Sequence, residues 1–225
     1  MDRIVIEIKG ADGIDLLHRI STWNAHKRQL GQTEEALLLN PAGKILAAFS
    51  ICPTSETSVQ ILIEDLADQS HSKKFLEVLD QFTFGEQYSL ATAPSVPFQP
   101  DHLSRIKNAK ALIGKEFLPD GKTSPLEVNL GNAIADQKGC YPGQEIIEKM
   151  ISIGSSPKRL VTLKSLTKID EDAPLMDGSQ QVGQITSAIQ DGEFWLALAI
   201  VRKTHTQVGQ TFTHGGNTLE IISQN

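Results

Sequence analysis

A thiol, a cation and two glycines lie close together in one octet of this chain. The octet runs from Lys138 to Glu145 and reads Lys-Gly-Cys-Tyr-Pro-Gly-Gln-Glu. The thiolate form of a cysteine is the nucleophile and the metal ligand, and a neighbouring cation favours that form. The octet therefore predicts a reactive Cys140, with Lys138 two residues away keeping the sulfur nucleophilic.

The residues that follow indicate how the chain holds this cysteine. The segment 146–151 contains apolar pairs and good helix formers, and Pro142 is tolerated in a first helical turn, where its missing N–H is not needed. We therefore expect Cys140 to lie just ahead of a short helix. The partial positive charge of that helix N-terminus would also favour the thiolate.

Small and polar residues complete the octet. Gly139 and Gly143 lack a Cβ, so the backbone there can turn tightly or approach a ligand closely. Gln144 and Glu145 place hydrogen-bonding groups on the first turn of the helix. Spacing alone leaves an alternative open, in which Cys140 is a small buried hydrophobic residue and the glycines only mark a strand-to-helix turn.

The octet closely resembles the Lys-Gly-Cys-Tyr-x-Gly-Gln-Glu signature of the YgfZ-type folate-binding proteins. These are relatives of the aminomethyltransferase, or T-protein, of the glycine cleavage system, and every fixed position of the signature is present here. The resemblance extends upstream to residues 125–130, which are similar to the family's Pro-Glu-x-Asn-Leu element. Downstream it includes Gly154, the run 158–160 and a segment at 182–187 that is similar to the family's C-terminal barrel.

The resemblance implies an α+β fold, an aminomethyltransferase folate-binding-like body with a small C-terminal β-barrel. It divides the chain into an N-terminal α+β part at 1–93, a second α+β part with the octet at 94–156, and the barrel at 157–225. The residue pattern agrees, because a proline-rich connector spans 93–100 and short strands with intervening turns follow Lys158.

Hydrophobic spacing predicts the individual elements. Alternating or apolar runs predict strands at 4–8, 35–39, 44–51, 59–63, 88–93, 160–163, 181–186, 194–201 and 219–222. Helical spacing predicts helices that Asp12 and Asp101 cap, the second ending at Gly114, and a helix over 75–82. Turns are expected at Asp177-Gly178, Asp191-Gly192 and Gly215-Gly216-Asn217.

A carboxylate upstream of the octet is the main candidate for binding a pterin. We expect residues 126–130 to be strand-like, with Glu127 and Asn129 on one face. A carboxylate can accept two parallel hydrogen bonds from an amino-pyrimidine edge, and the T-protein relatives have a glutamate in that role at the corresponding place. From the residues alone, a solvent-facing strand position for Glu127 remains open.

The resemblance implies tetrahydrofolate, or another reduced folate, as the cofactor. Besides Glu127, it makes these residues candidates for binding that cofactor: Tyr141, Gly143, Gln144, Glu145 and Lys149. Lys149 departs from the family, in which many members have an arginine. A lysine keeps the charge but not the planar fork needed for a bidentate contact with a folate carboxylate.

The resemblance further implies an accessory role in the assembly or repair of iron–sulfur clusters in enzymes, with a link to tRNA modification through such enzymes. The partners would be a reduced folate and iron–sulfur assembly proteins or client enzymes. We hypothesise that Cys140 engages a folate-borne group, a cluster sulfur or a partner thiol. The sequence leaves open whether there is turnover, which folate form binds, which client is served and what the oligomeric state is.

Two other functions compete with this reading. T-proteins carry an aspartate after a Gly-Lys-Ile-like segment, whereas here residues 43–46 are followed by Ala47 and Ala48, whose methyl groups cannot accept a proton or stabilise a cation. This absence weighs against a folate-dependent aminomethyltransferase. The second competitor is a non-catalytic scaffold that binds folate as a structural or sensing ligand.

Composition limits the remaining classes. A net charge of −6 over 225 residues disfavours direct nucleic-acid binding. Cys52 and Cys140 are too few for a disulfide framework, and no His-rich zinc spacing occurs, so no metal site is expected. The six histidines, including His18 in a predicted helix, are expected to be surface or satisfied residues. With no long apolar run or signal-like start, we expect a cytoplasmic protein without a membrane segment.

Overall fold

The computed structural model describes residues 1–154, 156–214 and 217–224. The chain forms two compact units, neither of which is one continuous segment. The first unit consists of residues 1–99, 118–123 and 131–149, and the second of residues 100–117, 124–130 and 150–225. The octet therefore belongs to the first unit and Glu127 to the second.

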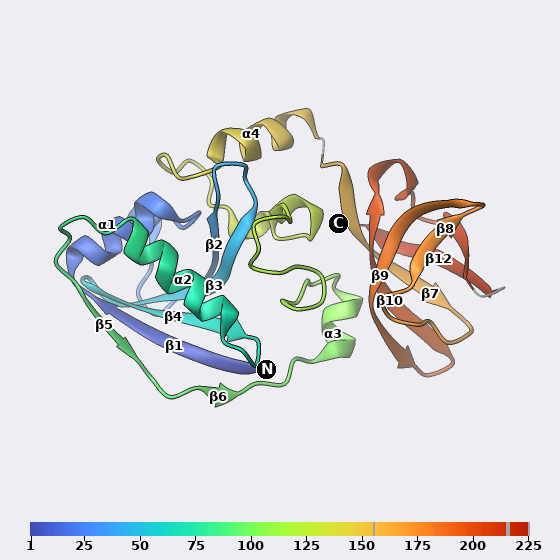
Figure 1. Ribbon diagram of the computed structural model, residues 1–225, viewed down its shortest axis with the longest axis horizontal. Helices are drawn as coiled ribbons and strands as arrows, with labels where there is room; N and C mark the ends of the chain where they lie inside the picture. Colours follow the sequence, from blue (N-terminus) through green and yellow to red (C-terminus); the bar gives the residue numbers. More distant parts are fainter. Residues whose placement is uncertain (155, 215–216, 225) are drawn as a thin grey trace. The chain divides into compact units, whose positions relative to one another are not determined.

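An antiparallel sheet forms the framework of the first unit (Figure 1). Its strands lie in the order β2-β3-β4-β1-β5, and β6 also pairs with β1. The bounds are β1 (Asp2–Lys9), β2 (Glu34–Leu39), β3 (Ile45–Ser55), β4 (Ser58–Asp65), β5 (Ser89–Thr92) and β6 (Val96–Pro97). The predicted hairpin is confirmed, because residues 40–44, which include the expected turn at 40–43, connect β2 to β3.

Alternation of apolar residues explains why these segments pair as they do. Ile4, Ile6 and Ile8 of β1 are buried, and the register of β1 with β4 places them opposite Ile63, Ile61 and Val59. Helix α2 (Ser70–Gln81) runs across the sheet and buries Phe75, Val78 and Leu79, as its spacing predicts (Figure 1).

Helix α1 (Ala11–Ile20) begins differently from the prediction. Gly10, with φ of 127°, holds the N-cap position, and no side chain caps the helix. The Asp12 carboxylate instead accepts a hydrogen bond from the backbone N–H of Gln87 at 2.8 Å. The expected Asp12 cap is therefore wrong, because a contact from a distant segment uses that carboxylate. A short 3-10 helix, η1 (Ala25–Lys27), follows α1.

A closed barrel forms most of the second unit, as expected for the C-terminal part. Its strands are β7 (Lys158–Ser165), β8 (Pro174–Asp177), β9 (Gln180–Asp191), β10 (Phe194–Arg202), β11 (Thr211–His214) and β12 (Asn217–Gln224). They close in the order β10-β7-β12-β11-β8-β9. The single turn η4 (Lys203–His205) follows β10, and the predicted turn residues Gly215 and Gly216 lie outside the described residues.

Helix α3 (His102–Lys107) belongs to the same unit and is shorter than predicted. Asp101 caps it as expected, since its Oδ1 accepts a hydrogen bond from the Ser104 N–H at 2.9 Å. The helix ends at Lys107 rather than near Gly114, because Ala109 has a φ of 48°, which a right-handed helix does not allow.

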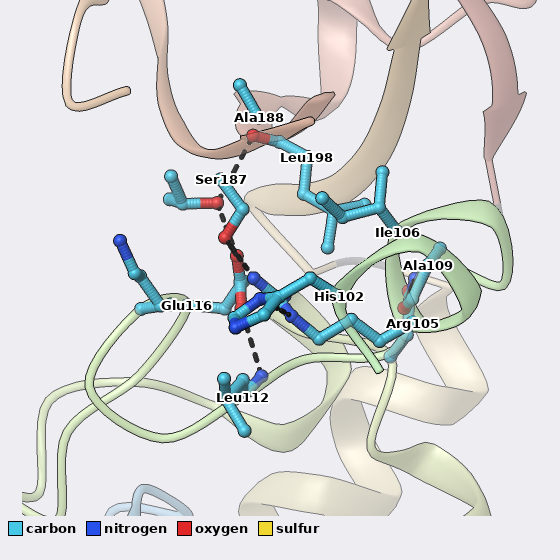
Figure 2. A network of polar contacts seen from close by, with 12 residues as sticks. His102, Arg105, Ile106, Ala109, Leu112, Glu116, Ser187, Ala188 and Leu198 are labelled. Atoms are coloured by element: carbon cyan, nitrogen blue, oxygen red, sulfur yellow. Dashed lines mark hydrogen bonds and ion pairs between the residues drawn. The ribbon is translucent and has the colours of Figure 1, made fainter. Parts of the chain in front are cut away.

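A buried polar network ties the segment after α3 to the barrel strand β9 (Figure 2). Arg105 Nη1 lies 3.0 Å from Glu116 Oε2, and both side chains are almost fully buried. Thr186 and Ser187 donate hydroxyl hydrogen bonds to Glu116 Oε1 at 2.7 and 2.6 Å, and the Leu112 N–H donates to Oε2 at 2.9 Å. The buried carboxylate is thus compensated by one cation and three donors.

Three further elements contain or adjoin predicted site residues along the chain. The 3-10 turns are η2 (Pro125–Glu127) and η3 (Gly131–Ala133), and helix α4 (Gln144–Ile153) follows the octet. The expectation of a strand-like segment at 126–130 is wrong, because η2 and the left-handed Asn129, with φ of 59°, interrupt any extended run.

Candidate functional site

Cys140 lies just ahead of α4, as predicted, in a stretch without regular secondary structure. The side chain is exposed and its thiol is free. The alternative of a small buried hydrophobic residue is therefore wrong. An exposed sulfur can reach a ligand or a partner protein, which the predicted chemistry requires.

Lys138 is held in place by the end of helix α1. Its Nζ donates a hydrogen bond to the backbone carbonyl of His18 and lies 5.2 Å from the centroid of the Tyr141 ring. Burial lowers the pKa of Lys138 to about 8, and the charge of an ionised Cys140 partly opposes this shift. The predicted role of Lys138 in keeping the Cys140 sulfur nucleophilic stays a prediction.

Tyr141 and Gln144 shape the turn into α4. The Tyr141 side chain is buried, and burial, with a smaller effect from Glu148, raises its pKa to about 12. The Tyr141 N–H donates to Gln144 Oε1 at 3.3 Å, and Gln144 Nε2 donates to Glu148 Oε1 at 2.5 Å. Both side chains therefore have a structural role in holding the loop that carries Cys140.

Gly143 packs directly on the turn between β2 and β3. It has a φ of 81°, and a Cβ on it would lie 2.5 Å from the Asn40 carbonyl oxygen and 2.9 Å from the Gly43 Cα. Any side chain would collide with backbone atoms, so this position requires glycine. The backbone of the hairpin turn is thus in direct contact with the octet at Gly143.

Glu145 and Lys149 are the remaining predicted residues of this unit. Both lie on α4 with exposed side chains. Glu145 occupies the first turn of the helix, where its charge suits the helix dipole. Their predicted roles in binding folate stay predictions.

Glu127 lies in the second unit and is buried, with 8% of its surface exposed. The Ser124 N–H donates to Glu127 Oε2 at 3.3 Å, so the carboxylate closes the short η2 turn on itself. A solvent-facing strand position for this residue is therefore wrong. A buried carboxylate is expensive unless hydrogen bonds compensate it, which makes the position a constrained one.

His18 is a neighbour of the octet that sequence reasoning missed. Its side chain is 8% exposed, and Nδ1 accepts a hydrogen bond from the Ala25 N–H at 3.2 Å, which leaves the proton of the neutral ring on Nε2. A Cβ on Gly139 would lie 3.7 Å from this Nε2. Burial, Lys138 and His26 lower the pKa of His18. No local signal predicts this contact, because it joins segments far apart in the chain.

The segment expected to lack a catalytic carboxylate forms the start of β3. Ala47 is fully buried, and the Ala48 N–H donates to His71 Nε2 at 2.8 Å. Residues 45–49 therefore contribute apolar side chains and no acid or base. This feature bears on aminomethyl transfer, which would need a carboxylate near the reacting group.

Neither a metal-binding cluster nor a membrane-spanning helix occurs within residues 1–154, 156–214 and 217–224. No three His, Cys, Asp or Glu side chains among these residues come together in a way that could hold a metal ion. None of the helices in these ranges is both long enough and apolar enough to cross a membrane.

Comparisons with known proteins give the chain relatives and a fold. No protein-family model matches the sequence. A chloroplastic protein of Arabidopsis thaliana, whose name describes a putative transferase, is 29% identical over 114 residues, which make up 50% of this chain and 25% of the relative. The chain thus spans about a quarter of the length of that relative.

A solved structure resembles nearly the whole chain. The crystal structure of the glycine cleavage system aminomethyltransferase T from Bartonella henselae matches with a TM-score of 0.81 and 15% identity, covering 99% of this chain and 84% of that one. Together with the closed barrel, this likeness establishes an α+β, aminomethyltransferase-like fold for the chain.

Proposed function

We propose that this protein binds tetrahydrofolate and assists the assembly or repair of iron–sulfur clusters in client enzymes, including enzymes that modify tRNA. The observation that carries the proposal is the exposed Cys140 thiol, held ahead of α4 and coupled in charge to Lys138. A thiol of this kind can engage a sulfur, a folate-borne group or a partner thiol. The cytoplasmic location remains a prediction, and the plant relative is described as chloroplastic.

Glu127 is the residue proposed to bind the pterin. Its carboxylate is buried and is already oriented by the Ser124 N–H. A carboxylate accepts parallel hydrogen bonds from an amino-pyrimidine edge, and such bonds gain strength away from water. A bound reduced folate would supply a one-carbon carrier, while the proposed task of the chain's own residues is to orient it.

The thiol hypothesis is tested by replacing Cys140 with Ser or Ala. We expect maturation of a tRNA-modifying iron–sulfur enzyme to fall by at least about ten-fold in cells that depend on this protein, because serine is a poor nucleophile and metal ligand. Cys52→Ser is the matched control, since Cys52 is only partly exposed on strand β3. Full maturation with a well-folded Cys140→Ala protein would contradict the proposal and favour the scaffold.

Folate binding is tested by calorimetric titration with tetrahydrofolate. Glu127→Gln keeps an oxygen that can accept the Ser124 N–H but loses the charge and one acceptor, so we expect binding at least about ten-fold weaker than in the wild type. Glu77→Gln on the exposed face of α2 is the control for charge loss. Equal affinity of Glu127→Gln and wild type would remove Glu127 from the site.

Aminomethyl transfer is the second candidate, because the solved structure with a similar fold is described as an aminomethyltransferase and the plant relative as a putative transferase. The alanines at 47 and 48 oppose it, because neither can act as an acid or a base. Incubation with an aminomethyl-loaded lipoyl carrier and tetrahydrofolate decides between the two. Release of ammonia that depends on the protein would establish the transferase, and its absence would leave the accessory role.

A further inference from the structure

A cleft lies in the first unit, beside the segment that follows α1 and the turn η1. Its volume is about 330 Å³, within the lower range of pockets that hold small molecules. The residues that matter for its chemistry are Trp23, Asn24, Lys27, Glu34, Glu35 and Asp136. None of them belongs to the octet or to the predicted folate site.

Asn24 gives the cleft an oriented hydrogen-bond donor. Its side chain is 5% exposed and lines the cleft. Oδ1 accepts a hydrogen bond from the His26 N–H at 3.1 Å, which fixes the orientation of the amide. The amide nitrogen has no hydrogen-bond partner within residues 1–154, 156–214 and 217–224. This nitrogen is not one of the fully buried atoms, so it is accessible from the cleft and can donate a hydrogen bond to an acceptor on a ligand.

Trp23 and Glu34 form a part of the cleft whose chemistry differs from that of Asn24. Trp23 is 1% exposed, and its Nε1 donates to Glu34 Oε2 at 2.6 Å, which fixes the carboxylate against the indole. An ammonium group is attracted both by a carboxylate and by an aromatic face. This part of the cleft is therefore suited to a cation.

The charged residues around the cleft favour a ligand that carries both a positive and a negative charge. Three carboxylates line it, those of Glu34, Glu35 and Asp136, against the single ammonium of Lys27, so the formal sum is −3 + 1 = −2. Lys27 Nζ lies 3.4 Å from the Asp136 carbonyl oxygen and 3.3 Å from Gln137 Oε1. These long contacts leave the exposed ammonium able to turn toward an anionic group.

We propose that this cleft binds a small zwitterion of the α-amino acid type. Its ammonium group lies against Glu34 and Trp23, and its carboxylate accepts hydrogen bonds from the Asn24 amide and Lys27. This inference goes beyond the proposed function and does not depend on it, because it involves neither Cys140 nor Glu127.

The cleft wall is continuous with the octet along the chain. The Thr22 hydroxyl donates to the Ala133 carbonyl at 2.5 Å, and the Ala135 N–H donates to the Thr22 carbonyl at 3.1 Å. Asp136 follows directly and leads to Lys138. An occupant of the cleft therefore contacts the segment that carries the predicted reactive residues.

The two tryptophan indoles allow a direct binding test. The chain has only Trp23 and Trp195, so a proton–nitrogen correlation spectrum gives two indole signals. Each of the twenty common amino acids, methylammonium and acetate is added to the intact protein up to about 10 mM, where a millimolar ligand saturates its site. We expect at least one amino acid to shift the Trp23 signal saturably, methylammonium to bind more weakly, and Trp195 to stay unchanged.

Two near-isosteric variants identify the contacts. Asn24→Asp keeps the oxygen that accepts the His26 N–H but replaces the amide donor, so the amino acid should bind at least about ten-fold more weakly while methylammonium binding persists. Glu34→Gln keeps an acceptor for Trp23 Nε1 but loses the charge, so both ligands should weaken. Glu77→Gln is the control and should change neither.

Two results would overturn the proposal. One is that no amino acid shifts the Trp23 signal of the wild type. The other is that the amino acid that binds wild type binds Asn24→Asp and Glu34→Gln with unchanged affinity, while both variants keep the native Trp195 signal. Loss of binding in the variants with loss of the Trp195 signal would mean unfolding, and Asn24→Ser then replaces Asn24→Asp with the same criterion.

Discussion

Lys138 is the octet residue whose charge depends most on its surroundings. With a pKa of about 8, it is mostly charged at neutral pH and mostly neutral above pH 9. The positive charge of Lys138 is therefore lost within a narrow range of mildly alkaline pH.

This pKa makes the stability of the protein depend on pH. Between pH 8 and the ordinary lysine value of 10.5, the unfolded chain holds its proton at Lys138 while the folded chain has released it, so the free energy of unfolding rises with pH. Relative to Lys138→Met, the wild type should gain on the order of 1 to 2 kcal/mol across this window, allowing for partial exposure. Urea unfolding of both proteins measures the gain, and parallel pH profiles would contradict it.

Gly143 is the residue of the octet with the strictest steric requirement. Gly143→Ala combines a positive φ with a Cβ 2.5 Å from the Asn40 carbonyl oxygen, so we expect a loss of more than about 2 kcal/mol in unfolding free energy. Gly31→Ala is the control, because Gly31 has a φ of 78° but no atom within 4 Å of the added Cβ, and it should cost about 1 kcal/mol. Equal losses in denaturant titrations would show that contact with the hairpin turn is unimportant.

For single residues, chemistry that depends on neighbours in the sequence could be predicted. Contacts with segments far away in the sequence could not. The exposed Cys140 and its charge partner Lys138 follow from two-residue spacing and a helix start, which are local. The carbonyl of His18 that holds Lys138, and the ring that faces Gly139, come from a helix far away in the sequence. The expected strand at Glu127 is wrong for another reason, because the carboxylate closes a local turn with the Ser124 N–H.

Among the elements, the connection between α3 and strand β9 depends on one buried carboxylate (Figure 2). Glu116 receives hydrogen bonds from Thr186, Ser187 and the Leu112 N–H, and pairs with Arg105. Removal of one member of such a network leaves the others buried without partners.

A double-mutant cycle measures this coupling. Arg105→Met and Glu116→Gln should each lower the unfolding free energy by about 3 to 5 kcal/mol, because each leaves buried polar groups uncompensated. The double variant should lose clearly less than the sum of the two, since both charges are then gone. Additive losses in urea unfolding would mean that the two residues act independently.

Strands and turns were predicted more reliably than helix ends. The alternation in β1, the hairpin of β2 and β3, and the Asp-Gly turns of the barrel all follow from local patterns that the sheets preserve. The N-cap of α1 and the end of α3 do not, because Asp12 binds Gln87 and Ala109 turns left-handed. The η2 turn replaced a predicted strand, since Pro125 and the Ser124–Glu127 bond favour a tight turn over an extended chain.

Over the whole molecule, stability is distributed unevenly. Strand β4 lies inside the first sheet with buried Val59, Ile61 and Ile63, whereas all four residues of β5 at the edge are exposed. Amides of residues 58–65 should therefore exchange at least about 100-fold more slowly than those of 89–97. Hydrogen exchange followed by mass spectrometry measures this difference, and similar rates in the two peptides would contradict it.

The fold as a whole was predicted through family likeness rather than through periodicity. Alternation alone indicated strands and a curled C-terminal sheet, and the resemblance of the octet added the aminomethyltransferase-like body that the Bartonella henselae structure bears out. The interleaved make-up of the two units, in which short stretches such as 118–123 and 124–130 alternate, has no signature in local sequence. It depends on which distant segments pack together.

The close packing of Gly143 on the turn between β2 and β3 couples the length of that turn to the position of the loop that carries Cys140. No side chain separates the two backbones where they meet. A longer turn at 40–43 would therefore displace the loop, and Cys140 with it. This turn should therefore not tolerate inserted sequence, such as a grafted loop or an affinity tag. The turn at Gly178 in the barrel is different, because open space surrounds that glycine. In diverging sequences, we expect the length of this turn and the glycine at position 143 to be kept together.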